Sequence, residues 1–325
     1  MSRNISTRAR RATFAAVFAL GAALAVPAFA DDLVRVGNPA GDDFHFSFAN
    51  VGTAAGIFKQ NGITLQITAL AGGAKLHQAM TAGSLDIALG AGTDFGLLVK
   101  GAPEKGVGVL ATVPSNIVIQ GNTRNGIAKI ADLKGKKVAV SSVGSLTYWM
   151  AQKLSQHEGW GLNGMQLVAT GGGQANVAGF ETGALDAAVT SLEAALRVEQ
   201  AGKGNILLSF GDIVNPFIAH VIYATNDMIA QHPDTLRRFL KGWYETVAWA
   251  KTHKAETIKY SQPETMLSDD LASKVYDVEI PTFSTDGRFD PKGVAAVDQA
   301  MIDLGTVKEK PADSAVFTES FLPKE

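Results

Sequence analysis

The sequence contains no cysteine, and this absence limits the chemistry that the chain can perform. It excludes disulfide bonds, thiolate metal ligands, a cysteine nucleophile and a lipid-modified cysteine. An excess of charge of one sign is also missing, because 29 lysines and arginines nearly balance 31 aspartates and glutamates. A near-neutral chain lacks the excess of positive charge that attracts nucleic acid or an anionic membrane. We therefore predict neither as a partner.

Long apolar runs are lacking as well, except for residues 12–26 near the N-terminus. Arginines precede this run, and the small-x-small pattern at residues 28–30 follows it. A basic start, a short apolar core and such a cleavage pattern are typical of a secretory signal peptide. The run is shorter than the ~20 residues of a membrane-spanning helix. We predict a signal peptide at residues 1–30 and a soluble, periplasmic mature protein without a lipid anchor.

Motifs for catalysis, cofactors or metal ions are not recognisable. The six histidines show no HExxH or other spacing of metal ligands. No GxSxG, phosphate-binding loop or complete GxGxxG is present, and residues 90–96 only approach the last of these. We predict no catalytic residues, no cofactor and no metal site.

Glycine, in contrast, is abundant and marks an internal repeat. Segments 72–88 and 172–188 share a Gly-Gly pair and a Gly-x-Leu-Asp-x-Ala stretch at identical spacing. A short apolar segment precedes each copy, at residues 63–70 and 165–170. Alternating strands and helices of this kind predict parallel sheets with crossover helices. The repeat therefore indicates two similar α/β units. Asp86 and Asp186, at equivalent positions, are predicted to have a repeated structural role away from any cleft.

We predict an α/β, two-lobed fold in which each lobe is a mostly parallel sheet flanked by helices. Two crossing strands would join the lobes, the first along residues 107–120 and the second within 206–224. The boundaries that follow are 31–114 plus 221–325 for lobe 1, and 115–220 for lobe 2. The polar tail from Glu309 is expected to pack loosely.

Four motifs, in the same order, resemble those of periplasmic solute-binding proteins of ABC importers for sulfonates, taurine, nitrate and thiamine precursors. They are Gly56–Ile63, Gly72–Ala88, Asp132–Val140 and His232–Leu240. The resemblance implies a type II, Venus-flytrap binding protein that captures a small solute between its lobes. It also implies a monomer that delivers the solute to an inner-membrane ABC permease with a cytoplasmic ATPase. Residues 191–194 depart from the family's aromatic-Glu-Pro element.

Ligands of open α/β sheets bind beyond the carboxyl ends of the strands. Here each such loop leads into a helix N-terminus, whose free N–H groups favour an anion. We therefore predict a small anionic solute, such as a sulfonate, nitrate or carboxylate, in which an aromatic or alkyl body is allowed. Ser145 and Thr147 are the preferred polar contacts, and Phe44 or Phe46 is expected to stack on the solute. The predicted ligand-binding residues are Asn38, Phe44, Phe46, Gly73, Thr93, Ser115, Gly144, Ser145, Thr147, Gly173, Gln174 and Ser191.

Two alternatives remain open at this point. A sensor module for a membrane kinase would share the fold and the site and differ only in its partner. An exported enzyme is the third reading, but the related thiamine-pyrimidine synthases use a cysteine-rich motif that this sequence does not have.

Overall fold

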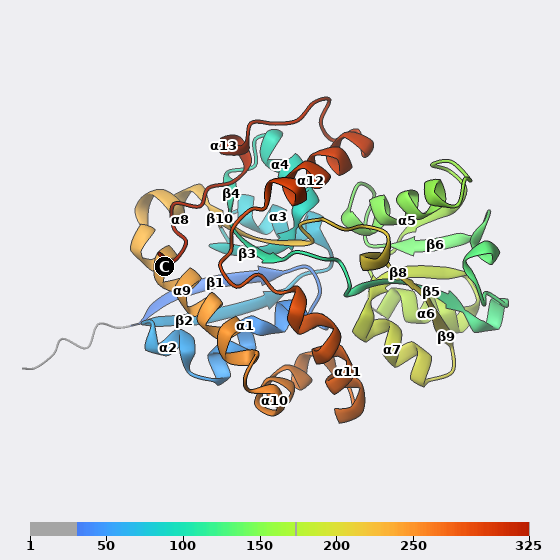
Figure 1. Cartoon of the computed structure of the whole chain (residues 1–325), viewed down its shortest axis with the longest axis horizontal. Helices are drawn as coiled ribbons and strands as arrows, with labels where there is room; N and C mark the ends of the chain where they lie inside the picture. The colour runs from blue at the N-terminus through green and yellow to red at the C-terminus, as the bar shows by residue number, and fades with distance from the viewer. Residues whose placement is uncertain (1–30, 173, 325) are drawn as a thin grey trace, which may run out of the picture. The chain divides into compact units, whose positions relative to one another are not determined.

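The computed structural model describes residues 31–172 and 174–324, so the predicted signal peptide lies outside the described residues (Figure 1). The described chain forms two five-stranded sheets flanked by helices, as predicted. None of the helices in these ranges combines the length and apolarity that a bilayer span requires.

The first sheet has the strand order β2-β1-β3-β10-β4. β1 runs parallel to β2 and β3, whereas β10 runs antiparallel to both of its neighbours, β3 and β4. The sheet is therefore mixed, with a parallel half and an antiparallel half. Its strands are β1 (Asp32–Asn38), β2 (Ile63–Ala69), β3 (Ile87–Ala91), β4 (Glu104–Ala111) and β10 (His220–Thr225).

The second sheet repeats this arrangement in the order β7-β6-β8-β5-β9. β6 is parallel to β7 and β8, and β5 is antiparallel to β8 and β9. Residues 206–210 were predicted to return to the first lobe, and this is wrong, because β9 pairs along β5 and closes the second sheet. The strands are β5 (Ile117–Asn122), β6 (Lys137–Val140), β7 (Gln166–Ala169), β8 (Ala187–Ser191) and β9 (Gly204–Ser209).

The repeated aspartates have the structural role that their spacing predicts. Asp86 accepts a hydrogen bond from the backbone N–H of Arg35 in β1, at 2.8 Å. Asp186 accepts the equivalent bond from Lys137 in β6, at 2.9 Å. Each carboxylate thus holds the start of one strand against the next strand of its own sheet.

Helices cover both sheets, and short 3-10 turns connect them (Figure 1). Around the second sheet lie α5 (Leu146–His157), α6 (Gln174–Thr182) and α7 (Leu192–Gln200). The other helices are α1 (Phe44–Ala54), α2 (Ile57–Gln60), α3 (Gly73–Thr81), α4 (Phe95–Val99), α8 (Asn226–Gln231), α9 (Pro233–Ala250), α10 (Lys254–Thr265), α11 (Asp269–Glu279), α12 (Pro291–Asp303) and α13 (Asp313–Val316).

The longest of these helices, α9, follows directly from its sequence. Pro233 is its first residue, where a missing N–H costs no intrahelical hydrogen bond. Leu236, Phe239 and Trp243 lie on one face and are completely buried against the first sheet's core. The apolar stripe at helical spacing therefore supplies the driving force for docking.

The C-terminal tail is not loosely packed, contrary to the expectation. Val316 is buried, and Phe317 forms a parallel bridge with Gly106 of β4. The Phe317 ring also stacks on Phe289 with centroids 4.2 Å apart. Burial of these apolar side chains holds the segment despite its polar composition.

Candidate functional site

A cavity of about 570 Å³ lies between residues of the two lobes. Its walls are the loops that follow the carboxyl ends of β1, β2, β6, β7 and β8. The lining residues of these segments lie within 39–43, 69–73, 141–147, 170–172 and 189–191, the last being the end of β8 itself, and Asp94, Ile117 and His220 also line the cavity. This is the place where ligands of open α/β sheets bind. The size suits a small organic molecule.

Five of the predicted ligand-binding residues line this cavity, namely Phe46, Gly73, Ser145, Thr147 and Ser191. Gln174 is the first residue of α6, next to the cavity residue Ala175. Gly173 lies outside the described residues.

Five other predicted residues do not line the cavity. Phe44 is a core residue, with edge-to-face contacts to Phe48 and Phe283. It faces inward because residues 44–54 form a helix that packs against α9, α10 and α11, with Phe44 and Phe48 on one face and Phe46 on another. Asn38 and Thr93 are buried behind the wall.

Ser115 and Gly144 lie outside the cavity for other reasons. Ser115 belongs to the first crossing between the sheets, where its carbonyl accepts a hydrogen bond from the Ser209 hydroxyl at 3.2 Å. Gly144 is exposed and has a φ of 77°, a left-handed conformation that glycine adopts without strain. Gly144 therefore makes the turn that presents Ser145.

Three hydroxyl groups form a triangle on the cavity wall. The Oγ of Ser141 lies 3.0 Å from the hydroxyl oxygens of both Ser145 and Thr147, which are 3.0 Å from each other. The Ser145 hydroxyl donates to the carbonyl of Ser142 at 2.7 Å and caps α5 by accepting from the N–H of Tyr148. The Ser145 oxygen also accepts from Ser141, so both of its acceptor positions are used.

Thr147 is the third member of this hydroxyl network. Its Oγ1 accepts a hydrogen bond from the Ser141 N–H at 2.9 Å. Because the Ser141 hydroxyl donates to Ser145, the Thr147 hydroxyl donates to Ser141 Oγ at 3.0 Å, and rotation of this hydroxyl can turn its hydrogen toward an acceptor inside the cavity. The arrangement therefore presents a hydrogen-bond donor to a solute.

Three carboxyl groups also line the cavity, and sequence reasoning did not select them. Asp42 pairs with Arg197 of α7. Asp94 accepts from His77 Nε2 at 2.9 Å and from the Ala91 N–H at 2.8 Å. Asp43, the third, caps α1 by accepting from the N–H of His45. The sequence signal was an Asp-Asp pair directly after the first strand, which is also the ordinary signal of a helix cap.

His77 is a buried cation between two carboxylates. Its Nδ1 lies 2.8 Å from Glu104 Oε1, and its Nε2 contacts Asp94. Burial alone would lower the pKa of His77, but Asp94 and Glu104 outweigh it and raise the pKa to about 10. The imidazolium therefore compensates the charge of Asp94 on the cavity wall.

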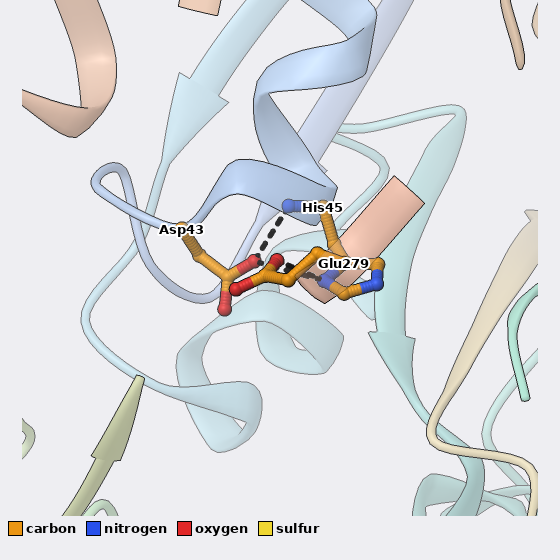
Figure 2. A group of neighbouring side chains, drawn as sticks. All are labelled: Asp43, His45 and Glu279. Atoms are coloured by element: carbon orange, nitrogen blue, oxygen red, sulfur yellow. Dashed lines mark hydrogen bonds and ion pairs between the residues drawn. The ribbon is translucent and has the colours of Figure 1, made fainter. Parts of the chain in front are cut away.

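A second buried polar group lies behind the cavity and contains Asp43, His45 and Glu279 (Figure 2). Burial lowers the pKa of His45 to about 4, so that its imidazole is neutral. Burial, and then the nearby Glu193 carboxyl, raise the pKa of Asp43 to about 7. Burial and the charge of Asp43 raise the pKa of Glu279 well above its usual range.

His220 adjoins both the cavity and this buried group. Its Nε2 lies 3.2 Å from the side-chain nitrogen of Asn116, and its ring is 5.4 Å from that of His45. Burial, followed by His45, lowers the pKa of His220 well below its usual range. His220 thus lines the cavity as a neutral group.

Direct contacts join the two lobes on both sides of the cavity. On one side, Glu193 of α7 accepts from the N–H of Phe44 at 2.5 Å, so the glutamate serves the N-terminus of α1 as well as its own helix. On the other side, the indole N–H of Trp149 in α5 donates to Asp303 of α12 at 3.2 Å. Lys153 reaches the same carboxylate at 3.6 Å.

Fold and cavity together define a two-lobed protein of the periplasmic-binding-protein type. The family model described as NMT1/THI5 like matches residues 44–257, and the chain belongs to that family. Among curated protein sequences, none matches the chain.

Solved structures share the fold at low sequence identity. The alkanesulfonate-binding protein SsuA of Xanthomonas axonopodis pv. citri, bound to MOPS, is 15% identical with a TM-score of 0.74, over 88% of this chain and 98% of that one. The aliphatic sulphonate binding protein SsuA of Escherichia coli is 18% identical with a TM-score of 0.70, over 88% and 92%. The desulfurization enzyme DSZB, solved with biphenyl-2-sulfinic acid, is 14% identical with a TM-score of 0.65, over 90% and 97%.

Proposed function

We propose that this protein is an extracytoplasmic substrate-binding protein of an ABC importer, which captures a small organic anion and delivers it to a membrane permease. The observation that carries this proposal is the cavity between the lobes, with a hydroxyl donor that can turn toward a solute and several helix N-termini on its walls. Membership of the family and the sulfonate-binding proteins of the same fold support it.

The charges of the cavity restrict where the anion is held. Among the described lining residues there is no lysine or arginine, so backbone N–H groups and hydroxyls would bind the anion. A carboxylate such as Asp43 repels an anion, whereas the hydroxyl triangle does not. We therefore expect the anionic group beside Thr147 and the N-terminus of α5. Phe46, Leu70 and Leu146 would contact the apolar body of the solute.

Replacing Thr147 with valine is expected to weaken binding about tenfold to hundredfold. The change keeps the shape of the side chain and removes a donor to a charged acceptor, which contributes ~1.5–3 kcal/mol. A thermal-shift screen of alkanesulfonates, nitrate, aromatic carboxylates and pyrimidines identifies the ligand, because a specific binder raises the melting temperature. Calorimetric titration of that ligand then gives the Kd of each variant.

Thr147→Ser retains the hydroxyl and is the matched control, with an affinity close to that of the natural protein. Equal affinities for the valine and serine variants would contradict the assignment of the anion to this wall. Failure of every anion in the screen to stabilise the protein would contradict the proposed function itself.

We further propose that binding closes the lobes about the crossings near residues 113–115 and 215–220. Under this proposal, Arg197→Gln is expected to weaken solute binding by up to about fivefold, because it removes a partly buried ion pair to Asp42 that holds the lobes together. Small-angle scattering of the unliganded variant should report a larger radius of gyration. Arg237→Gln, which removes an exposed pair within α9, is the control. Unchanged scattering and affinity for the Arg197 variant would argue against a role for this pair in closure.

The desulfurization enzyme DSZB has the same fold, so each solute that binds is also tested for chemical conversion by the protein. We expect each bound solute to be recovered chemically unchanged after long incubation, as judged by mass spectrometry. Conversion of a solute at a rate that depends on protein concentration would show that the protein is an enzyme.

A further inference from the structure

The buried group behind the cavity contains the donor atoms of a metal site. One donor atom each from Asp43, His45 and Glu279 lies within 4.8 Å of the other two. Asp43 caps α1, His45 is the second residue of α1, and Glu279 ends α11, so the donors come from the ends of two helices. Figure 2 shows the three side chains pointing toward one another.

The tautomer of His45 leaves a lone pair in the centre of this group. The Thr282 hydroxyl donates to the carbonyl of Glu279 at 2.7 Å, so it accepts from the Nε2–H of His45, also at 2.7 Å. With one ring proton on Nε2, the His45 Nδ1 carries a lone pair. It faces Glu279 Oε2 at 2.8 Å and Asp43 Oδ1 at 3.9 Å.

A single proton can satisfy only one pair of these facing acceptors, whereas a metal ion can satisfy all three. Within the described residues, neither His45 Nδ1 nor either carboxyl oxygen of Glu279 makes a hydrogen bond, although both side chains are completely buried. Glu193 adds another buried carboxyl group beside them, and its Oε2 also has no hydrogen-bond partner in the described chain. Buried carboxylates are normally paired or bound to metal ions.

We propose that His45, Asp43 and Glu279 bind a divalent first-row transition metal ion, such as Zn²⁺, Mn²⁺ or Fe²⁺. A neutral imidazole with carboxylate oxygens is the donor set that these ions take, whereas Ca²⁺ and Mg²⁺ prefer oxygen alone. Metal–ligand bonds of ~2.0–2.2 Å place neighbouring donors roughly 3–3.6 Å apart. The separations of 2.8 and 3.9 Å bracket that spacing.

The surrounding contacts are those of a supported site. Thr282 orients the His45 ring from its far nitrogen, and Asn116 donates to Asp43 Oδ2 at 3.2 Å. Such outer contacts fix the tautomer and direction of metal ligands. Asp43 also lines the cavity, so an ion can enter from that side. His77 has no ring nitrogen left for a metal ion, because each of its two ring nitrogens already contacts a carboxylate.

The proposal is tested with the untagged, full chain after treatment with a chelator. Equilibrium dialysis against Zn²⁺, read by elemental analysis, is expected to give one bound ion per chain. Co²⁺ in its place should produce a visible absorption band. Glu279→Gln and His45→Gln are expected to weaken Zn²⁺ binding more than tenfold and to remove the Co²⁺ band. Glu264→Gln, in α10, and His232→Gln are the matched controls and should bind as the natural protein does.

Absence of stoichiometric Zn²⁺ and Co²⁺ binding by the natural protein would overturn the proposal, and the group would then be a network of protonated carboxyls. Unchanged binding by both folded ligand variants would overturn it as well. If those variants do not fold, Thr282→Val replaces them and should weaken Zn²⁺ binding about tenfold through the His45 ring. No solute enters this experiment, so its outcome is independent of the proposed transport function.

Discussion

Replacing His77 with leucine is expected to lower the free energy of unfolding by about 3–5 kcal/mol, because it leaves two buried carboxylates without their cation. Glu104 is fully buried, and Asp94 is only slightly exposed, so water cannot replace the lost partner. Asp94 also accepts the N–H of Ala91 beside the cavity. The variant is therefore expected to lose solute binding together with stability. Urea unfolding at constant pH measures the first effect.

The same group gives the protein a defined pH dependence. The pKa of His77 is raised to about 10 in the folded state, above the ordinary histidine value of 6.5. The folded protein therefore binds the proton more tightly than the unfolded chain does. This contribution to stability is fully present below pH ~6.5 and is lost as the pH rises toward ~10.

A comparison across pH separates this effect from a simple packing defect. The difference in unfolding free energy between the natural protein and His77→Leu should shrink between pH ~6.5 and ~10. His157→Leu, at an exposed position on α5, should show a small and pH-independent difference. A His77→Leu penalty that stays constant over this range would show that the imidazolium charge is not the cause.

Replacing Ala71 with tryptophan is expected to reduce solute binding by a factor of a hundred or more while leaving the fold intact. Ala71 is exposed and lines the cavity in the loop before α3, so the backbone can accept a larger side chain there. An indole directed into a cavity of about 570 Å³ would occupy space that the solute needs. Calorimetric titration with the ligand found in the thermal-shift screen measures the loss.

The control is Ala54→Trp, at the exposed end of α1 and outside the described cavity wall. Both variants should unfold at temperatures within a few degrees of the natural protein, because neither position is buried. An Ala71→Trp protein that binds the solute with unchanged affinity would place the binding site elsewhere and would contradict the proposed function.

Much of the fold could be predicted from the sequence because its signals are local. The Gly-Gly pairs, the Leu-Asp stretches and the strands before them lie within short segments, and they predicted both α/β units. The Ser141, Ser145 and Thr147 hydroxyls meet because one strand end and one helix cap bring together residues at most six positions apart. Phe44 was predicted to contact the solute because phenylalanine alternates at positions 44, 46 and 48. These residues lie in helix α1, where this spacing does not place them on one face.

The sequence by itself determined the two-unit α/β architecture, the loops that face the cavity and the hydroxyl donors among them, because short-range patterns specify strands, helix caps and turns. Only the tertiary structure decided how the charges are arranged. Arg197 meets Asp42 across 155 positions, and Glu279 meets His45 from another helix altogether. Such pairs depend on how distant helices pack, and no spacing in the chain records that packing.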